Sequence, residues 1–273
     1  MSLRVNTNTM AFNAYRNLSA TDTEMGKSLE KLSSGLRINR AGDDAAGLVI
    51  SENLRSLFGG LKQAVRNAQD GISVVQTAEG ALTEVHSMLQ RIRDLSVQAA
   101  STGSSGGATS TAVQAAQAEV NQLVSAIDDI ARRTQFNGQA LLSGASTLTF
   151  QVGANSGETL TVSTAGMGAT ALGINGLSLA NAGTAITSLD AAISTVSAQR
   201  GLFGAAQNRL EHTIANLSVT QENLSASESR IRDTDMAAEM TEFSKSQILM
   251  QAGTAMLAQA NSAPQQVLSL LKG

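Results

Sequence analysis

The sequence predicts a mainly α-helical protein, an elongated antiparallel coiled-coil bundle that carries one β-hairpin. Three observations lead to this expectation. Apolar residues recur at intervals of seven over two long stretches, which is typical of coiled coils. Proline, which breaks helices, occurs once in 273 residues, at Pro264. One stretch in the middle of the chain instead alternates apolar and polar residues, as strands do.

The clearest helical pattern lies toward the C-terminal end of the chain. Apolar residues seven apart form its first seam: Leu189, Val196, Phe203, Leu210, Leu217, Leu224 and Ile231. A second seam, offset by four, is half polar: Ile193, Arg200, Gln207, Ile214, Gln221 and Glu228. Each helical residue adds about 1.5 Å, so this helix is longer than a small domain is wide. Another helix must therefore run beside it.

A partner helix is predicted in the first half of the chain. Its first seam also repeats every seven residues: Leu54, Leu61, Ala68, Val75, Leu82 and Leu89. Phe58, Val65 and Ile72 form the second seam. The next two positions of this seam, Glu79 and His86, are polar. There the apolar face shifts to Val85, Ile92 and Leu95. After a Gly/Ser-rich break at 101–110, a shorter helix has its apolar face at Val113, Ala116, Val120, Leu123, Ile127 and Ile130. These three helices form the bundle.

The β-hairpin is expected at about 148–163. Leu148, Phe150 and Val152 alternate with polar residues, as do Leu160 and Val162, and GANSGE between them has the composition of a turn. Residues 164–184 are mostly small and polar, which predicts a short irregular connection on the surface.

Both ends of the chain are predicted to be amphipathic helices. The N-terminal stripe consists of Leu18, Met25, Leu29, Leu32 and Leu36. The C-terminal stripe consists of Met236, Phe243, Met250 and Leu257, with Met240 offset by four. Terminal helices fray unless their apolar faces are covered. These two stripes therefore need each other or neighbouring subunits.

The sequence offers no constellation for catalysis, a cofactor or a metal. Cysteine is absent, and the two histidines, His86 and His212, are far apart in the chain. Asp43 and Asp44 precede an alanine-rich run, which indicates a helix N-cap rather than a metal site. The segment GSSGG at 103–107 lacks the lysine of a phosphate-binding loop. No enzymatic activity is expected.

Charge and hydropathy exclude two further classes of partner. The formal net charge of −3 implies no nucleic acid or other polyanion. The apolar runs are too short to span a bilayer, and the first residues lack the apolar segment of a secretory signal peptide. The chain is therefore expected to stay in the cytosol or to leave the cell by another route.

Several long segments resemble bacterial flagellins. The N-terminal region of that family is similar to KLSSGLRINRAGDDAAGLVIS at 31–51 and NAQDGISVVQTAEGALTEV at 67–85. The resemblance continues through LQRIRDLSVQAA at 89–100 and RTQFNGQALL at 133–142, and resumes at 229–271. It covers most of the chain outside about 143–190. The central region is short, so the outer variable domains of long flagellins are expected to be absent.

The resemblance implies a domain organisation and a route out of the cell. Residues 1–42 and 231–273 would pair as an inner domain in the filament core, and residues 43–230 would form the surrounding bundle. The protein would be exported unfolded by the flagellar type III apparatus and would polymerise outside the cell into the helical filament used for swimming. The two apolar stripes named above would form the filament-core interface.

The resemblance also implies partners and leaves two alternatives open. A flagellar export chaperone would cover the C-terminal helix, and the hook–filament junction and cap proteins would meet the ends of the filament. A hook–filament junction protein is the nearest alternative, because such proteins resemble flagellins at their ends. A cytosolic coiled-coil scaffold would explain the heptads but not the uncovered termini.

A host receptor is a further implied partner. Arg91, Leu95 and Glu119 match positions through which flagellins resemble ligands of the vertebrate Toll-like flagellin receptor. Arg91 and Leu95 are four residues apart and share a helical face. The alternative reading is that Arg91 and Glu119 form a surface ion pair while Leu95 packs in the bundle or between subunits. The two readings are compatible if the receptor binds monomers.

Overall fold

The computed structural model describes residues 7–101 and 110–272, with side chains described through residue 263. The chain divides into two compact units, which are treated separately. Unit 1 contains the described residues up to Ser56 and those from Asn223 onward, and unit 2 contains Leu57–Glu222. Both segments predicted to form the inner domain, 1–42 and 231–273, fall in unit 1.

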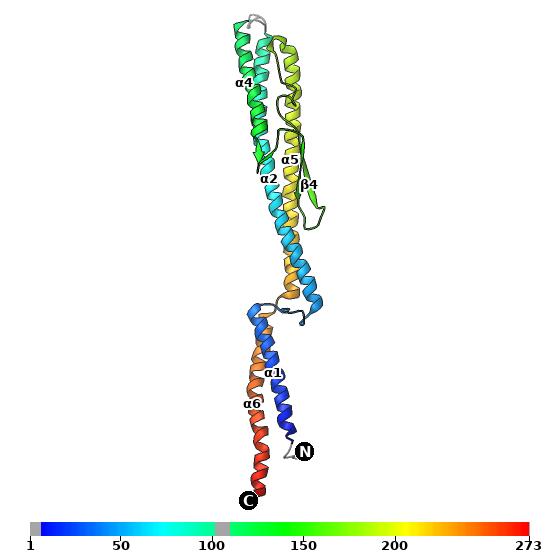
Figure 1. Ribbon diagram of the computed structural model, residues 1–273, viewed down its shortest axis with the longest axis vertical. Helices are drawn as coiled ribbons and strands as arrows, with labels where there is room; N and C mark the ends of the chain where they lie inside the picture. Colours follow the sequence, from blue (N-terminus) through cyan, green and yellow to red (C-terminus); the bar gives the residue numbers. More distant parts are fainter. Residues whose placement is uncertain (1–6, 102–109, 273) are drawn as a thin grey trace. The chain divides into compact units, whose positions relative to one another are not determined.

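Three helices build unit 2, as predicted: most of α2 (Ala45–Ala100), α4 (Thr111–Arg133) and most of α5 (Ala182–Arg232) (Figure 1). Two ion pairs link α2 to α5, and their positions show that the two helices are antiparallel. Arg93 Nε lies 2.7 Å from Asp190 Oδ1, and Arg200 Nη2 lies 3.7 Å from Glu79 Oε1. Glu79 and Arg200, two of the polar residues that interrupt the second seams, thus meet each other. The Gly/Ser-rich break between α2 and α4 falls mainly on residues 102–109, outside the described residues.

The predicted seams form the core of unit 2. Leu61, Leu82 and Leu89 of α2 are at most 7% exposed, and Leu189, Val196 and Leu210 of α5 are fully buried. On α4, the buried side chains are Val113, Val120, Ile127 and Ala131. A period of seven therefore identified the core positions, because it keeps the same side chains facing a neighbouring helix.

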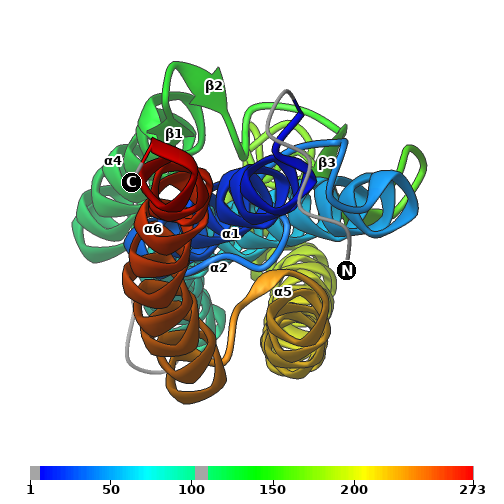
Figure 2. The ribbon, with the colours of Figure 1, turned by 90° about the horizontal axis from the view of Figure 1, so that it is seen from below.

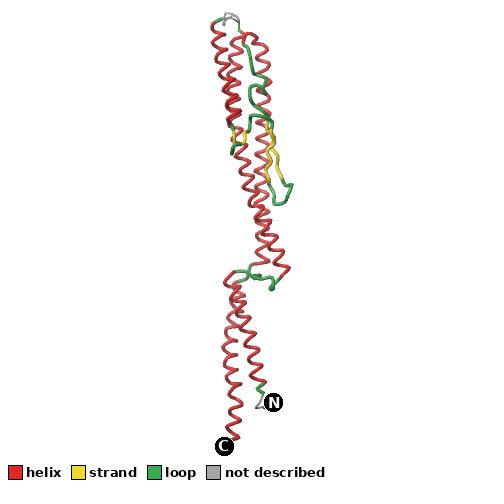
Figure 3. Tube along the Cα trace, viewed as in Figure 1, coloured by secondary structure: helices red, strands yellow, loops and turns green. Residues whose placement is uncertain are grey.

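The predicted β-hairpin is present, with ends within two residues of the expected ones. Strand β3 (Ser146–Gln151) pairs antiparallel with β4 (Thr159–Thr164), both drawn in yellow in Figure 3. In this register Leu148 lies opposite Val162. A second, very short hairpin was not predicted. It joins β1 (Gln135–Phe136) to β2 (Gln139–Ala140).

An Asn-Gly dipeptide forms the turn of the short hairpin. Asn137 and Gly138 have φ angles of 48° and 79°, the left-handed pair that a type I′ turn requires. Asn-Gly is the commonest sequence for this turn, so the signal was present in the chain. The strands beside it are only two residues long and show no alternating pattern that would have drawn attention to it.

The expectation of a surface connection over 164–184 is wrong. Its irregular backbone is confirmed up to the 3-10 helix η1 (Leu179–Asn181), after which α5 begins at Ala182. Its apolar side chains, however, enter the core, since Met167, Ala169 and Ile174 are fully buried. Their spacing follows neither helix nor strand periodicity, so the sequence pattern did not show their inward direction.

Side chains of α4 hold this buried connection in place. The carboxylate of Asp128 accepts a hydrogen bond of 2.6 Å from the backbone N–H of Ala169. The amide of Gln117 donates to the carbonyl of Leu177 at 2.8 Å and accepts from the N–H of Leu179 at 2.7 Å. These bonds satisfy backbone groups that no regular secondary structure would pair.

Unit 1 is built around α1 (Thr9–Ser34) and α6 (Met236–Lys272), which lie side by side (Figure 2). They are antiparallel, because the Asn8 amide at the start of α1 donates 2.7 Å to the carbonyl of Ala260, far along α6. At the other end, Lys31 Nζ lies 3.5 Å from Glu239 Oε2 near the start of α6. The prediction that both ends of the chain are helical is confirmed.

The loop between α1 and α2 is tightly organised. Gly35 ends α1 with a left-handed φ of 73° and donates to the carbonyl of Lys31. Backbone hydrogen bonds then tie the loop to the end of α5, where Arg37 N–H donates to Arg232 O at 2.7 Å. Asp44 accepts from the N–H of Gly47 at 2.8 Å and so caps α2, as predicted.

Candidate functional site

The two paired helices of unit 1 bury very little apolar surface between them. Among the described residues of unit 1, the buried apolar side chains are Ile38 and Ala260. Three small polar residues, Ser28, Ser51 and Ser246, are also buried there. Small residues allow two helices to approach closely but contribute little hydrophobic stabilisation, which scales with the apolar area buried. Unit 1 therefore lacks a core of its own that could account for its apolar residues.

The apolar residues of unit 1 are instead exposed. Of fourteen exposed large apolar side chains among the described residues, eleven belong to unit 1: Met10, Phe12, Tyr15, Leu29, Val49, Ile50, Met236, Met240, Ile248, Leu249 and Met256. Unit 2 exposes three, Val97, Leu202 and Val219. A soluble monomer rarely exposes so many large apolar side chains on one compact unit unless some of them take part in binding. We call these eleven side chains the apolar surface of unit 1.

The predicted interface residues divide between this surface and the seam of the helix pair. Leu29, Met236 and Met240 are 57%, 47% and 51% exposed. The others are half-buried: Leu18, Met25 and Leu32 of α1, Leu36 of the loop that follows α1, and Phe243, Met250 and Leu257 of α6. Most of the apolar surface was not predicted, because its side chains lie outside the two stripes. The run Ile248-Leu249-Met250 was a usable signal, since consecutive residues on a helix cannot all face one partner.

Two grooves flank Leu18 where α1 packs on α6. One, of about 510 Å³, is lined mainly by Met10, Asn13, Leu249 and Met256, together with Leu18. The other, of about 280 Å³, includes Tyr15, Met250 and Leu18. The helices approach closely here, because a Cβ atom on Gly253 would lie only 3.1 Å from Leu18 Cδ1. Both grooves can receive apolar side chains of another molecule.

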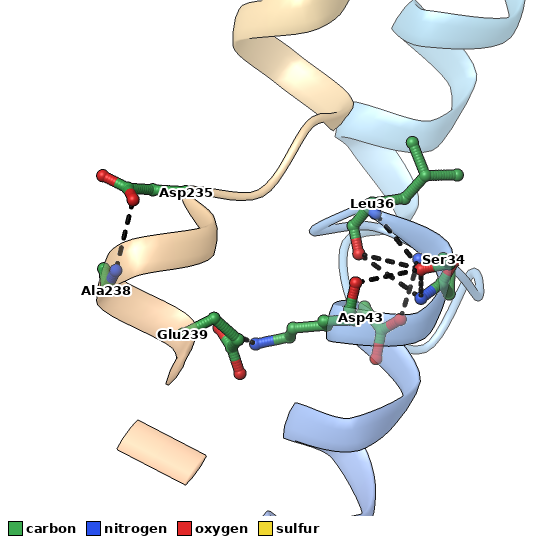
Figure 4. A network of polar contacts seen from close by, with 8 residues as sticks. Ser34, Leu36, Asp43, Asp235, Ala238 and Glu239 are labelled. Atoms are coloured by element: carbon green, nitrogen blue, oxygen red, sulfur yellow. Dashed lines mark hydrogen bonds and ion pairs between the residues drawn. The ribbon is translucent and has the colours of Figure 1, made fainter. Parts of the chain in front are cut away.

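A polar network organises the end of the helix pair nearest the loop (Figure 4). The Ser34 hydroxyl accepts from the N–H of Leu36 at 3.1 Å and from the Asn39 amide at 2.8 Å. Asp43 accepts from the N–H groups of Arg40 and Asn39, and these hydrogen bonds lower its pKa. On α6, Asp235 accepts from the N–H of Ala238 and caps the helix.

The described residues show no arrangement of acidic or imidazole groups, three or more together, that could hold a metal ion. None of the described helices is long and apolar enough to cross a membrane. The polar pocket beside the loop contains Lys27, Lys31 and Arg37 together with Asp43 and Asp44, so opposite charges there offset one another.

The three residues matched to receptor recognition lie in unit 2. Arg91 Nε is 2.8 Å from Glu119 Oε1, and their side chains are 55% and 42% exposed. The hydrogen bond to Glu119 raises the pKa of Arg91. Leu95 is only 4% exposed and belongs to the core. The structure therefore shows the surface ion pair and the packed leucine, and receptor recognition stays a prediction.

Comparison with known proteins finds one family along most of the chain. Residues 5–147 match the bacterial flagellin N-terminal helical region, and residues 186–271 match the bacterial flagellin C-terminal helical region. The flagellin of Bacillus subtilis (strain 168) is 49% identical over 99% of this chain and 100% of its own length. That of Halalkalibacterium halodurans is 52% identical over 98% of this chain and 99% of its own.

Matches to solved structures cover part of the chain. The crystal structure of Bacillus cereus flagellin is 34% identical, with a TM-score of 0.49 over 56% of this chain and 88% of that one. A candidate flagellar hook-associated protein from Vibrio parahaemolyticus is 14% identical, with a TM-score of 0.57 over 70% of this chain and 100% of that one, a likeness of fold alone. The near-complete matches to flagellins do not favour the hook–filament junction or the scaffold alternative. The chain belongs to the bacterial flagellin family and is a structural subunit of the extracellular flagellar filament that drives swimming.

Proposed function

We propose that residues 1–42 and 231–273, which fall in unit 1, form the inner wall of the filament, and that the apolar surface of unit 1 joins neighbouring subunits. In this arrangement residues 1–42 and 231–273 act as the inner domain, and residues 43–230 act as the surrounding bundle. The observation that carries the proposal is the concentration of eleven exposed large apolar side chains on a unit with almost no core. The role is mechanical, and it requires no catalysis.

Subunits would associate head to tail rather than by a two-fold axis. A surface on one subunit then meets a different surface on the next, and a rotation that does not close gives an open helical tube. Burying one large apolar side chain contributes about 1.5–3 kcal/mol. Several such side chains per subunit are enough to hold a polymer together without covalent bonds.

Replacing two exposed apolar residues of unit 1 tests the wall directly. We expect Leu29→Ser with Met240→Ser to raise the critical concentration for polymerisation at least about tenfold, which corresponds to ~1.4 kcal/mol. The matched control is Leu202→Ser with Val219→Ser, because these side chains of unit 2 are 58% and 59% exposed. Sedimentation of filaments measures the effect. An equal rise for both pairs would count against the wall.

The C-terminal helix would be covered by an export chaperone before assembly. Its stripe of Met236, Phe243, Met250 and Leu257, with Met240 beside it, is apolar surface that would otherwise aggregate in the cytosol. The same surface, left open at the two ends of the filament, would contact the hook–filament junction and cap proteins. This proposal follows from the family and from the partial burial of the stripe by α1.

Loss of two stripe residues should weaken chaperone binding and polymerisation together. We expect Phe243→Ser with Leu257→Ser to lower chaperone affinity at least about tenfold, because each change removes apolar contact area. Calorimetric titration with the purified chaperone measures it, and Leu202→Ser with Val219→Ser again serves as the control. An unchanged affinity of the variant for the chaperone would contradict the proposal.

A vertebrate Toll-like flagellin receptor would contact Arg91 and Glu119 on monomers. These two side chains are exposed and joined, whereas Leu95 would act by packing the helices that carry them. Monomers should therefore activate cells that bear the receptor, and intact filaments should activate them much less if neighbouring subunits cover this face.

A double substitution separates receptor contact from loss of folding. We expect Arg91→Ala with Glu119→Ala to reduce receptor activation by folded monomers. Arg93→Ala with Asp190→Ala is the matched control, because it removes an ion pair of similar length between helices of the same unit. Full activation by the first variant, with an unchanged circular dichroism spectrum, would refute the assignment.

A further inference from the structure

The methionines of this chain are unevenly exposed. Four of the nine, Met10, Met236, Met240 and Met256, are 47–63% exposed, and all four belong to unit 1. In unit 2, Met88 is half-buried and Met167 is fully buried. Met25 and Met250 are half-buried in the helix pair, and Met1 lies outside the described residues. The side chains that an oxidant reaches first are therefore those of the apolar surface of unit 1.

The exposed methionines sit where another subunit would dock. Met10 of α1 and Met256 of α6 line the same groove, together with Leu18 and Leu249. Met236 and Met240 lie one turn apart near the start of α6 and are close to half exposed. Methionine suits such a surface, because its flexible thioether adapts to an apolar partner. The same sulfur is open to oxidation while the partner is absent.

We propose that Met10, Met236, Met240 and Met256 form an oxidation-sensitive site that blocks assembly of the monomer when they are converted to sulfoxides. This inference rests on the proposed role of unit 1 as the filament wall. Hydrogen peroxide supplies the oxygen atom: the lone pair of Sδ forms an S–O bond to one peroxide oxygen, the O–O bond breaks, and the proton on the transferred oxygen passes to the leaving hydroxide, which departs as water. The sulfur is oxidised and the peroxide is reduced, so no further reactant is needed.

Oxidation would change the chemistry of the surface at the points of contact. A sulfoxide carries a strong hydrogen-bond acceptor, and burying it without a donor is unfavourable. Four of them occur in every subunit, so the cost repeats along the polymer. In an assembled filament the neighbouring subunits cover these sulfurs, and the filament is therefore resistant. Methionine sulfoxide reductases can reverse the change in a monomer.

The experiment compares monomers and filaments of the full chain treated with hydrogen peroxide. Peptide mass mapping should find sulfoxide at the four exposed methionines of the monomer before it appears at Met88 or Met167. The critical concentration of the oxidised monomer should rise at least about tenfold. Treatment with both stereospecific methionine sulfoxide reductases should restore polymerisation, because each enzyme reduces one epimer.

Two variants distinguish a failure of the oxidation proposal from a failure of the proposed filament wall. Replacing all four exposed methionines by Leu should give a protein that polymerises and resists peroxide, whereas Met88→Leu with Met167→Leu should remain sensitive. A four-fold variant that polymerises but stays sensitive overturns the oxidation proposal and leaves the wall intact. If the four-fold variant does not polymerise, the proposal is tested by reductase treatment of the oxidised native chain. A native chain that still fails to polymerise after its sulfoxides have been fully reduced overturns the proposal. Equal oxidation rates in filaments and monomers would count against the wall.

Discussion

Removal of residues 236–273 is expected to abolish filament formation while unit 2 stays folded. The deletion takes away α6, which contributes five of the eleven side chains of the apolar surface and one half of the helix pair. The core of unit 2 contains no residue from this segment, since its apolar cluster runs from Ala68 to Leu210. Without α6, the apolar face of α1 is uncovered and the helix should fray.

Electron microscopy of concentrated protein measures the expected loss of filaments, and urea unfolding followed by circular dichroism measures the folding of unit 2. A cooperative transition of the truncated chain, close to that of the full-length monomer, is the expected control result. Filaments of normal appearance from the truncated protein would show that α6 is dispensable and that the wall lies elsewhere. A truncated chain without a cooperative transition would show that unit 2 depends on α6.

The substitution Phe203→Ala is expected to lower the free energy of unfolding by about 3–5 kcal/mol, the usual cost of removing a buried phenylalanine ring. Phe203 is 1% exposed and lies on the first seam of α5, inside the cluster that joins the three helices of unit 2. The cavity left behind cannot close easily, because long helices packed along their length move little at a single position.

Leu202→Ala is the matched control for this substitution. Leu202 is the preceding residue on the same helix, but its side chain is 58% exposed, so its loss should change the free energy of unfolding by no more than about 0.5 kcal/mol. Urea titration of the monomer gives both values under one set of conditions. Equal losses for the two variants would contradict the assignment of the heptad seam to the core.

The long helices could be located from the sequence because their pattern is repeated many times. On α5, a period of seven over Leu189–Leu217 places five successive side chains in the core, and all five are at most 8% exposed. The hairpin at 146–164 was found for a similar reason, since alternation survives over both of its strands. Asp44 was identified as a helix cap because capping is decided within one turn of the chain.

Features that depend on contacts between residues distant in sequence could not be predicted from local sequence patterns. The directions of Met167 and Ile174 follow from contacts with helices already in place, and an irregular backbone carries no period that would reveal them. Leu95 and Arg91 share a helical face in sequence terms, yet one is 4% exposed and the other makes an exposed ion pair. Residues four apart point in directions about 40° apart, and the position of the neighbouring helix decides which is covered.

The chain alone therefore specified the helices, the hairpin, the core seams of the bundle and the apolar character of both termini, since each is a local repeat or a local capping signal. The packed structure determined how little α1 and α6 cover each other. An apolar stripe in the sequence shows that a helix has an apolar face. The area of that face that stays exposed to water depends on the helix packed against it. On α1 and α6 the buried side chains are Ser28, Ser246 and Ala260, and eleven large apolar side chains of unit 1 stay exposed. That remainder is apolar area whose burial is favourable only when another subunit arrives.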